Sequence, residues 1–98
     1  MEIIKNSEGS KLNLAVVGRL DTNTAPVLES ELSSGLDGIE ALCFDFEKLD
    51  YISSAGLRVL LSAQKKMSKQ GTMKLKNVNE DIMEILEITG FVDILTIE

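Results

Sequence analysis

Two stretches of the chain carry an apolar residue at every second position, namely 11–17 and 73–76. A period of two residues is typical of a strand with one buried face. The continuous apolar run 41–46 predicts a more central strand. The apolar pair 3–4, followed by the polar stretch 6–10, predicts a short first strand that forms a hairpin with the strand at 11–17.

Three other stretches carry apolar residues at the spacing of a helix. The first follows a cluster of capping residues, has Pro26 in its first turn and ends at Gly35 or Gly38. The second runs from about residue 55 to residue 69, with an apolar inner face. The third follows Asn79, whose side chain is a favoured helix cap.

The predicted order is strand, strand, helix, strand, helix, strand, helix and a last short strand near residues 94–97. Strands that are joined through a helix lie parallel, whereas the two tightly joined first strands must be antiparallel. We therefore expect an α/β fold with a mixed, mostly parallel sheet, an N-terminal antiparallel hairpin and helices mainly on one face. The length of 98 residues predicts one domain over 1–98.

The composition excludes several kinds of chemistry. The chain contains one cysteine, Cys43, and no histidine, so it can form neither an internal disulfide nor a Cys/His zinc cluster and has no histidine base. We expect no metal and no cofactor, and interpret Cys43 as a small apolar strand residue. A net charge of −6 argues against nucleic acid as a partner. No apolar run approaches the about 20 residues that cross a bilayer, and the first residues lack a signal-peptide pattern, so we expect a cytoplasmic protein without membrane insertion.

The charges lie in blocks. Residues 58–76 hold six basic and no acidic residues, 78–98 hold six acidic and no basic ones, and 20–47 hold seven acidic and no basic ones. Such blocks arise when a soluble protein places its charges on solvated faces. They also arise when distinct patches steer a protein partner toward one surface. The sequence leaves both interpretations open.

The segment 52–61, Ile-Ser-Ser-Ala-Gly-Leu-Arg-Val-Leu-Leu, stands between a strand-like stretch and the second helix. Either Ser53 or Ser54 can cap that helix, and Gly56 allows another surface to approach its first turn. The chain has no histidine, and no lysine follows Ser53 or Ser54 in a Ser-x-x-Lys spacing, which argues against a serine hydrolase. A serine there can instead accept a phosphate, because the helix N-terminus favours negative charge.

Two motifs together resemble a known family. Residues 18–26, Gly-Arg-Leu-Asp-Thr-Asn-Thr-Ala-Pro, are similar to a Gly-x-Leu/Ile-Asp-x-x-x-Ala pattern that leads into a first helix. Residues 52–61 are similar to a phosphorylation-site segment of the type Asp-Ser-Ser/Thr-Gly-Leu, and residues 85–91 resemble that family's last helix and its end. On these segments the whole chain resembles the anti-sigma factor antagonists, which are bacterial STAS-domain proteins.

The resemblance implies partner switching, in which the unphosphorylated antagonist binds an anti-sigma factor and frees a sigma factor. The anti-sigma factor is often a GHKL-type serine kinase that holds the ATP, and a PP2C-type phosphatase reverses the phosphorylation. The phosphoacceptor aligns with Ser54, with Ser53 as second choice; Ser53 replaces the family's usual Asp, and Ala55 its usual Ser or Thr. The implied partner-binding residues are Asp21, Thr22, Asn23, Thr24, Ser53, Ser54, Ala55, Gly56, Leu57 and Arg58.

Three roles remain to be distinguished. The chain is expected to be a binding module and not an enzyme, and to be a monomer when free. The same domain also serves as an accessory subunit of phospholipid ABC transporters and as an interaction module in other assemblies. A nucleotide-binding protein is the third role, although the chain has neither a Gly-x-x-x-x-Gly-Lys-Ser/Thr loop nor a Gly-x-Gly-x-x-Gly motif.

Overall fold

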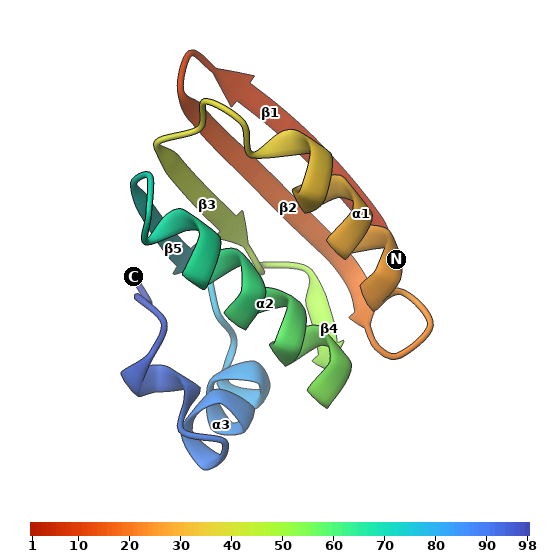
Figure 1. Ribbon diagram of the computed structural model, residues 1–98. Helices are drawn as coiled ribbons and strands as arrows, with labels where there is room; N and C mark the ends of the chain where they lie inside the picture. The colour runs from red at the N-terminus through yellow and green to blue at the C-terminus, as the bar shows by residue number, and fades with distance from the viewer.

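The computed structural model describes all of residues 1–98 and contains five strands, three α-helices and one short 3₁₀ helix (Figure 1). In chain order the elements are β1 (Glu2–Glu8), β2 (Lys11–Leu20), α1 (Ala25–Gly35), β3 (Ala41–Asp45), β4 (Leu49–Ile52), α2 (Ser54–Met67), β5 (Thr72–Lys76), α3 (Glu80–Ile88) and η1 (Phe91–Asp93).

The long strand β2 organises the sheet because three other strands pair with it. Strand β1 is antiparallel to it, β3 is parallel to its first half, and β4 is parallel to its last residues. Strand β5 is parallel to β3 on the far side. The predicted mixed sheet with an N-terminal antiparallel hairpin is therefore confirmed.

Helices α1 and α2 lie across one face of this sheet, and α3 lies at the end of the molecule near β4 (Figure 1). The covered face is apolar: 24 buried apolar residues form a single cluster, and no polar side chain is buried. Along β2 the predicted alternation holds, since Leu12 and Leu14 are buried and Asn13 between them is not. The expectation of helices mainly on one face is confirmed.

The first hairpin is longer than the sequence predicted. The polar residues 6–8 belong to β1 and pair with residues 11–13 of β2, and only Gly9 and Ser10 form the turn. An edge strand exposed on both faces needs no apolar side chains, because its backbone hydrogen bonds to β2 hold it in place. The apolar pattern therefore could not reveal its second half.

Strand β4 is missing from the predicted order, and the predicted last strand is not formed. Strand β2 continues past Gly18, which has a φ of +96°, and the register of pairing shifts there as β2 passes from β3 to β4. Near the C-terminus, residues 91–93 form the 3₁₀ helix, and only a single bridge joins Ile97 to Leu75. Both differences depend on pairing between distant segments.

The predicted helix boundaries are largely correct. Pro26 lies in the first turn of α1, and α1 ends at Gly35. The side chain of Asn79 caps α3 by accepting a hydrogen bond of 2.9 Å from the Ile82 N–H. Helix α2 begins at Ser54 and ends at Met67, close to the predicted range. No helix of the structure is both long enough and apolar enough to cross a membrane.

Candidate functional site

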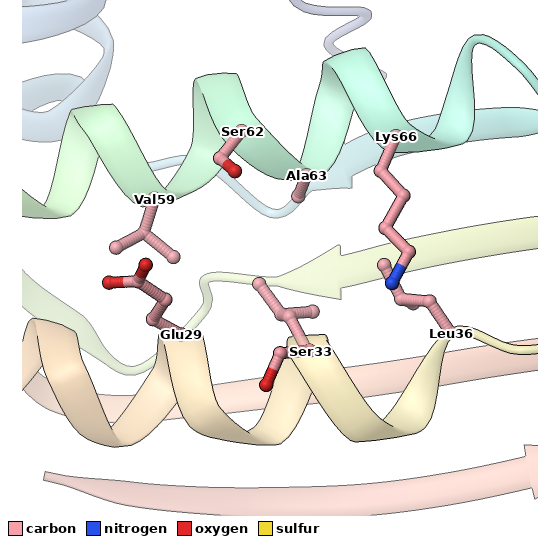
Figure 2. Close-up of a pocket in the computed structure, with 8 residues that line it drawn as sticks. Glu29, Ser33, Leu36, Val59, Ser62, Ala63 and Lys66 are labelled. Carbon is pink, nitrogen blue, oxygen red and sulfur yellow. The ribbon is translucent and has the colours of Figure 1, made fainter.

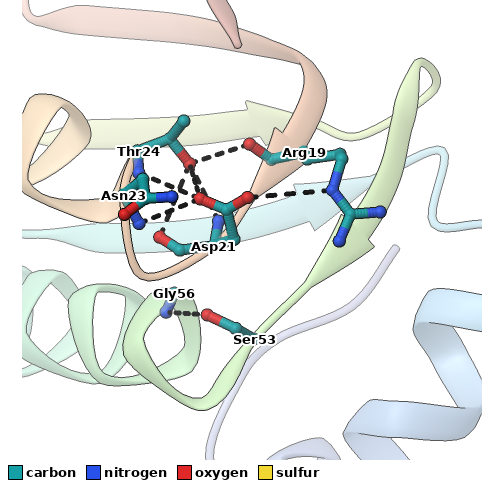
Figure 3. Close-up of polar contacts among 6 residues, drawn as sticks. All are labelled: Arg19, Asp21, Asn23, Thr24, Ser53 and Gly56. Carbon is teal, nitrogen blue, oxygen red and sulfur yellow. Dashed lines mark hydrogen bonds and ion pairs between the residues drawn. The ribbon is translucent and has the colours of Figure 1, made fainter.

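The loop between β2 and α1 is closed by the side chain of Asp21 (Figure 3). Its Oδ1 accepts hydrogen bonds from the N–H groups of Asn23, at 3.0 Å, and Thr24, at 3.1 Å. In return, the Asp21 N–H donates to the Thr24 hydroxyl oxygen at 2.8 Å, and this hydroxyl donates to the Arg19 carbonyl at 2.8 Å. These bonds fix the conformation of the four residues that lead into α1.

The same bonds favour the charged form of Asp21. The hydrogen bond from the Thr24 N–H is the main reason that the pKa of Asp21 lies below its ordinary value, and the hydroxyl of Thr24, the N–H of Asn23 and the charge of Arg19 act in the same direction. Partial burial opposes this shift without cancelling it. The loop therefore carries a fixed negative charge at neutral pH.

Arg19 connects this loop to β4. Its Nε lies 3.7 Å from Asp21 Oδ2, and its guanidinium carbon lies 4.4 Å from the centre of the Tyr51 ring. Arg19 and Tyr51 are neighbours in the pairing of β2 with β4, which explains the stacking. Neither residue stands out in the sequence, since their contact depends on a strand pairing that has no periodic signal.

The two serines at the start of α2 have different positions. Ser53 is the N-cap, and its Oγ accepts a hydrogen bond of 3.3 Å from the Gly56 N–H (Figure 3). Ser54 is the first residue of the helix, its side chain is exposed, and its hydroxyl has no hydrogen-bond partner within the chain. Of the two serines that could cap the helix, the structure assigns the cap to Ser53 and leaves Ser54 accessible.

The first turn of α2 lies directly against the end of β2. A Cβ atom on Gly56 would lie 2.8 Å from Leu20 Cγ and 2.9 Å from Ile52 Cγ1. In addition, the Ser53 N–H donates a hydrogen bond of 2.9 Å to the Leu20 carbonyl. The close approach that Gly56 allows is thus an approach by the chain itself, where the sequence suggested another surface.

The structure brings the two predicted motifs together. Thr22 from the first motif and Ala55 and Arg58 from the second line one hollow on the surface. The predicted partner-binding residues divide by exposure: Thr22, Asn23, Ser54 and Arg58 are exposed, Asp21, Thr24, Ser53 and Ala55 are half-buried, and Gly56 and Leu57 are buried. Gly56 and Leu57 therefore support this surface from below and offer little area to a partner.

Few other reactive groups accompany the two serines. No group of three or more metal-ligating side chains is present. Neither Ser53 nor Ser54 has a basic side chain as hydrogen-bond partner. Cys43 lies half-buried in β3, where burial raises the pKa of its thiol and makes the thiolate scarce. The arrangement can present a serine to an enzyme, but it holds no group that would activate that serine.

Comparison with known proteins gives a consistent family. The model of the STAS domain matches residues 3–98. BtrV of Bordetella bronchiseptica, described as an anti-sigma factor antagonist, is 33% identical over 99 residues, which cover 99% of this chain and 85% of BtrV. The anti-sigma-B factor antagonist of Bacillus subtilis is 31% identical over 98 residues, which cover 99% of this chain and 88% of that protein.

Solved structures share the fold. The unphosphorylated form of the anti-sigma factor antagonist SpoIIAA superposes with a TM-score of 0.78 at 13% identity and covers 99% of this chain and 87% of SpoIIAA. The phosphorylated form of the Bacillus SpoIIAA superposes with a TM-score of 0.77 at 14% identity. The superposition covers 99% of this chain and 91% of that chain. The fold and the family resemblance predicted from the sequence are both confirmed.

A substitution at Gly56 tests the contact between α2 and β2. Gly56→Ala should lower the free energy of unfolding by about 1–3 kcal/mol, because the added methyl group overlaps Leu20 and Ile52. The matched control is Gly35→Ala in α1, where the new Cβ meets only the end of the Lys5 side chain at 3.7 Å. This control should be neutral or slightly stabilising, as alanine favours helices. Equal effects of both substitutions in urea denaturation would contradict the proposed contact.

The lowered pKa of Asp21 predicts a pH dependence of stability. A carboxylate with a lowered pKa in the folded state stabilises the protein above its ordinary pKa of about 4, and this contribution disappears as the pH falls through the folded value. Asp21→Asn should therefore lower the melting temperature at pH 7, and the difference from the unmodified protein should shrink below pH 4. Asp37→Asn, which alters an exposed aspartate without hydrogen bonds, should have no such effect. A difference for Asp21→Asn that stays constant from pH 7 to pH 3 would refute this role.

Proposed function

Since the chain belongs to the STAS domain family, we propose that it is an anti-sigma factor antagonist whose binding to the anti-sigma factor is controlled by phosphorylation of Ser54. The observation that carries this proposal is the position of Ser54. It is exposed at the first residue of α2, and the neighbouring Ser53 holds the helix cap in its place. A kinase can thus modify Ser54 without removing a hydrogen bond that the fold needs.

A phosphate on Ser54 would be tolerated by the fold. The N–H groups of Ser54 and Ala55 point out of the first turn of α2 and have no acceptor within the chain. Free N–H groups and the positive end of the helix dipole favour a phosphate, which carries about −1.5 to −2 charges at neutral pH. Because this chain superposes almost equally well on both forms of SpoIIAA, a phosphorylated antagonist with this fold is sterically reasonable.

Loss of binding would then follow from the interface and not from a change of fold. The fixed charge of Asp21 lies in the other motif of the same surface, and Asp50 is exposed in the neighbouring strand β4. A phosphate would add two further negative charges to a surface that the partner must cover. Desolvation of an unpaired dianion at an interface costs several kcal/mol, which weakens binding by a factor of about a thousand or more.

The proposed cycle assigns every catalytic step to partners. The unphosphorylated chain binds an anti-sigma factor and so releases a sigma factor. A GHKL-type kinase, which is often the anti-sigma factor itself, holds the ATP and transfers a phosphate to Ser54. A PP2C-type phosphatase removes this phosphate. The chain itself acts as substrate and binding module.

The assignment of the phosphoacceptor can be tested with two single variants. Ser54→Ala should abolish phosphorylation by the partner kinase while it leaves binding and stability almost unchanged, because Ser54 is not the cap. Ser53→Ala should lose about 1 kcal/mol of stability with the cap but should still be phosphorylated at Ser54. Mass spectrometry locates the phosphate, and urea denaturation reports the stability. A phosphate on Ser53 in the Ser54→Ala variant would mean that Ser53 is the acceptor.

The identity of the partner separates this function from the transporter alternative. Affinity capture with the unphosphorylated chain, followed by mass spectrometry, should recover a protein with a GHKL kinase domain. Capture should fail with protein phosphorylated at Ser54. Recovery of an ABC transporter ATPase, with no dependence on phosphate, would favour the accessory role over the proposed switch.

A further inference from the structure

A groove runs between α1 and α2 on the surface that faces away from the sheet (Figure 2). Two adjoining hollows form it, with volumes of about 280 and 130 Å³, and both are lined by Glu29, Val59 and Ser62. The first hollow begins at Thr22 and Ala55, next to Ser54, and the second continues along both helices. We call these two hollows together the α1–α2 groove. It starts at the proposed phosphorylation site and extends away from it.

The floor of the α1–α2 groove is apolar and tightly packed. Leu32 and Val59 are each 5% exposed, and Ala63 is 4% exposed. Lys66 from α2 and Glu29 from α1 reach toward the opposite helix above this floor (Figure 2). A groove with an apolar floor and charged walls fits an amphipathic polypeptide segment.

The α2 wall of the groove carries positive charge that takes part in no salt bridge within the chain. Its lining includes Arg58 and Lys66, and Lys65 lies beside Lys66 on the same helix; none of the three takes part in a salt bridge. The three salt bridges of the structure use the basic residues Lys5, Arg19 and Lys74. Three unpaired cations on one helix contrast with the net charge of −6 for the whole chain.

We propose that the α1–α2 groove docks an acidic, amphipathic segment of the protein partner, with apolar side chains on the floor and carboxylates toward α2. This inference rests on the proposed function, because it extends the partner's contact surface from Ser54 along α2. The argument is charge complementarity. The unpaired cations of α2 attract an acidic segment, whereas the rest of this acidic chain repels it. The segment therefore binds with its carboxylates toward α2. The single opposing charge in the groove is Glu29.

Two other occupants fit less well. Nucleic acid would be repelled by the net charge and would find in the groove only the cations between residues 58 and 66, a length of about 12 Å. A second copy of the chain could offer the acidic face of α3, which holds Glu80, Asp81, Glu84 and Glu87. Such a contact of α3 on α2 closes into a dimer only if the reciprocal contact forms at the same time, and otherwise it continues into a ring or a filament.

The docking surface also accounts for the sensitivity of binding to one phosphate. Ser54 and Arg58 are four residues apart on α2, so their side chains are neighbours on the exposed face of the helix. A phosphate on Ser54 would attract the Arg58 guanidinium and compete with the carboxylates of the partner for it. Arg58 would thus contact the partner when Ser54 is unmodified and the phosphate when Ser54 is phosphorylated.

The test uses a defined peptide probe and needs neither a kinase nor the natural partner. The probe is an 18-residue amphipathic helical peptide of Glu and Leu, and its twin carries Gln in place of Glu. Titrated into isotope-labelled protein, the Glu peptide should shift the amide signals of Ser33, Ser62 and Lys66. Its affinity should fall about tenfold between 50 and 300 mM salt, because the cations are exposed. The Gln twin should bind about tenfold more weakly than the Glu peptide at low salt.

Matched variants locate the interaction. Lys66→Glu should weaken binding of the Glu peptide about tenfold, and Glu29→Gln should strengthen it severalfold. Lys48→Glu makes the same change of charge at an exposed lysine outside the groove and should have little effect. Equal losses for Lys48→Glu and Lys66→Glu, no binding at all, or signal shifts on α3 or on the uncovered sheet face would overturn the proposal.

Two further measurements test whether a second copy of the chain or nucleic acid occupies the groove instead. Sedimentation of the unmodified protein should show a monomer, and a 12-base-pair DNA duplex should not shift the groove signals. Self-association that Lys66→Glu abolishes would assign the groove to a second copy instead, and DNA binding as tight as that of the peptide would assign it to nucleic acid. None of these measurements involves Ser54 phosphorylation, so their failure is distinguishable from failure of the proposed switch.

Discussion

The site depends on one close contact, that of the first turn of α2 with the end of β2. Gly56 lies where any side chain would overlap Leu20 and Ile52, and the Ser53 N–H bonds the Leu20 carbonyl. This contact joins Leu20 of one motif to Ser53 and Gly56 of the other, which are more than 30 residues away in the sequence. Because core packing is close to crystalline density, the resulting surface is rigid. On the proposed function, a phosphate on it would change what a partner meets and would leave the fold beneath unaltered.

The two adjacent serines at the start of α2 differ in what they contact. Ser53 turns inward and holds the helix start, whereas Ser54 turns outward and bonds nothing within the chain. On the other side of the contact, Asp21 holds its own loop in the same way, through backbone N–H groups. Each element of the surface is therefore fixed by a residue other than Ser54, the proposed phosphoacceptor.

Much of this arrangement could be predicted from the sequence, and the limits have a physical cause. Period-two and helical patterns located the helices, the cap at Asn79 and most strands, since these features are local. Strand β4 and the stacking of Arg19 on Tyr51 were missed, because both arise only when distant segments pair. The motifs indicated two segments that the fold brings to one surface, but not that Gly56 is buried or that Ser53 alone is the cap.

The most direct test of this account compares the amide spectra of the unphosphorylated chain and the chain phosphorylated at Ser54. A rigid surface predicts shifts confined to the loop at residues 21–24 and the first turns of α2, where the phosphate and Arg58 lie. The signals of α3 and of the strands β1, β3 and β5 should stay in place. Widespread shifts across α3 and the sheet would contradict the account and would establish a conformational switch instead.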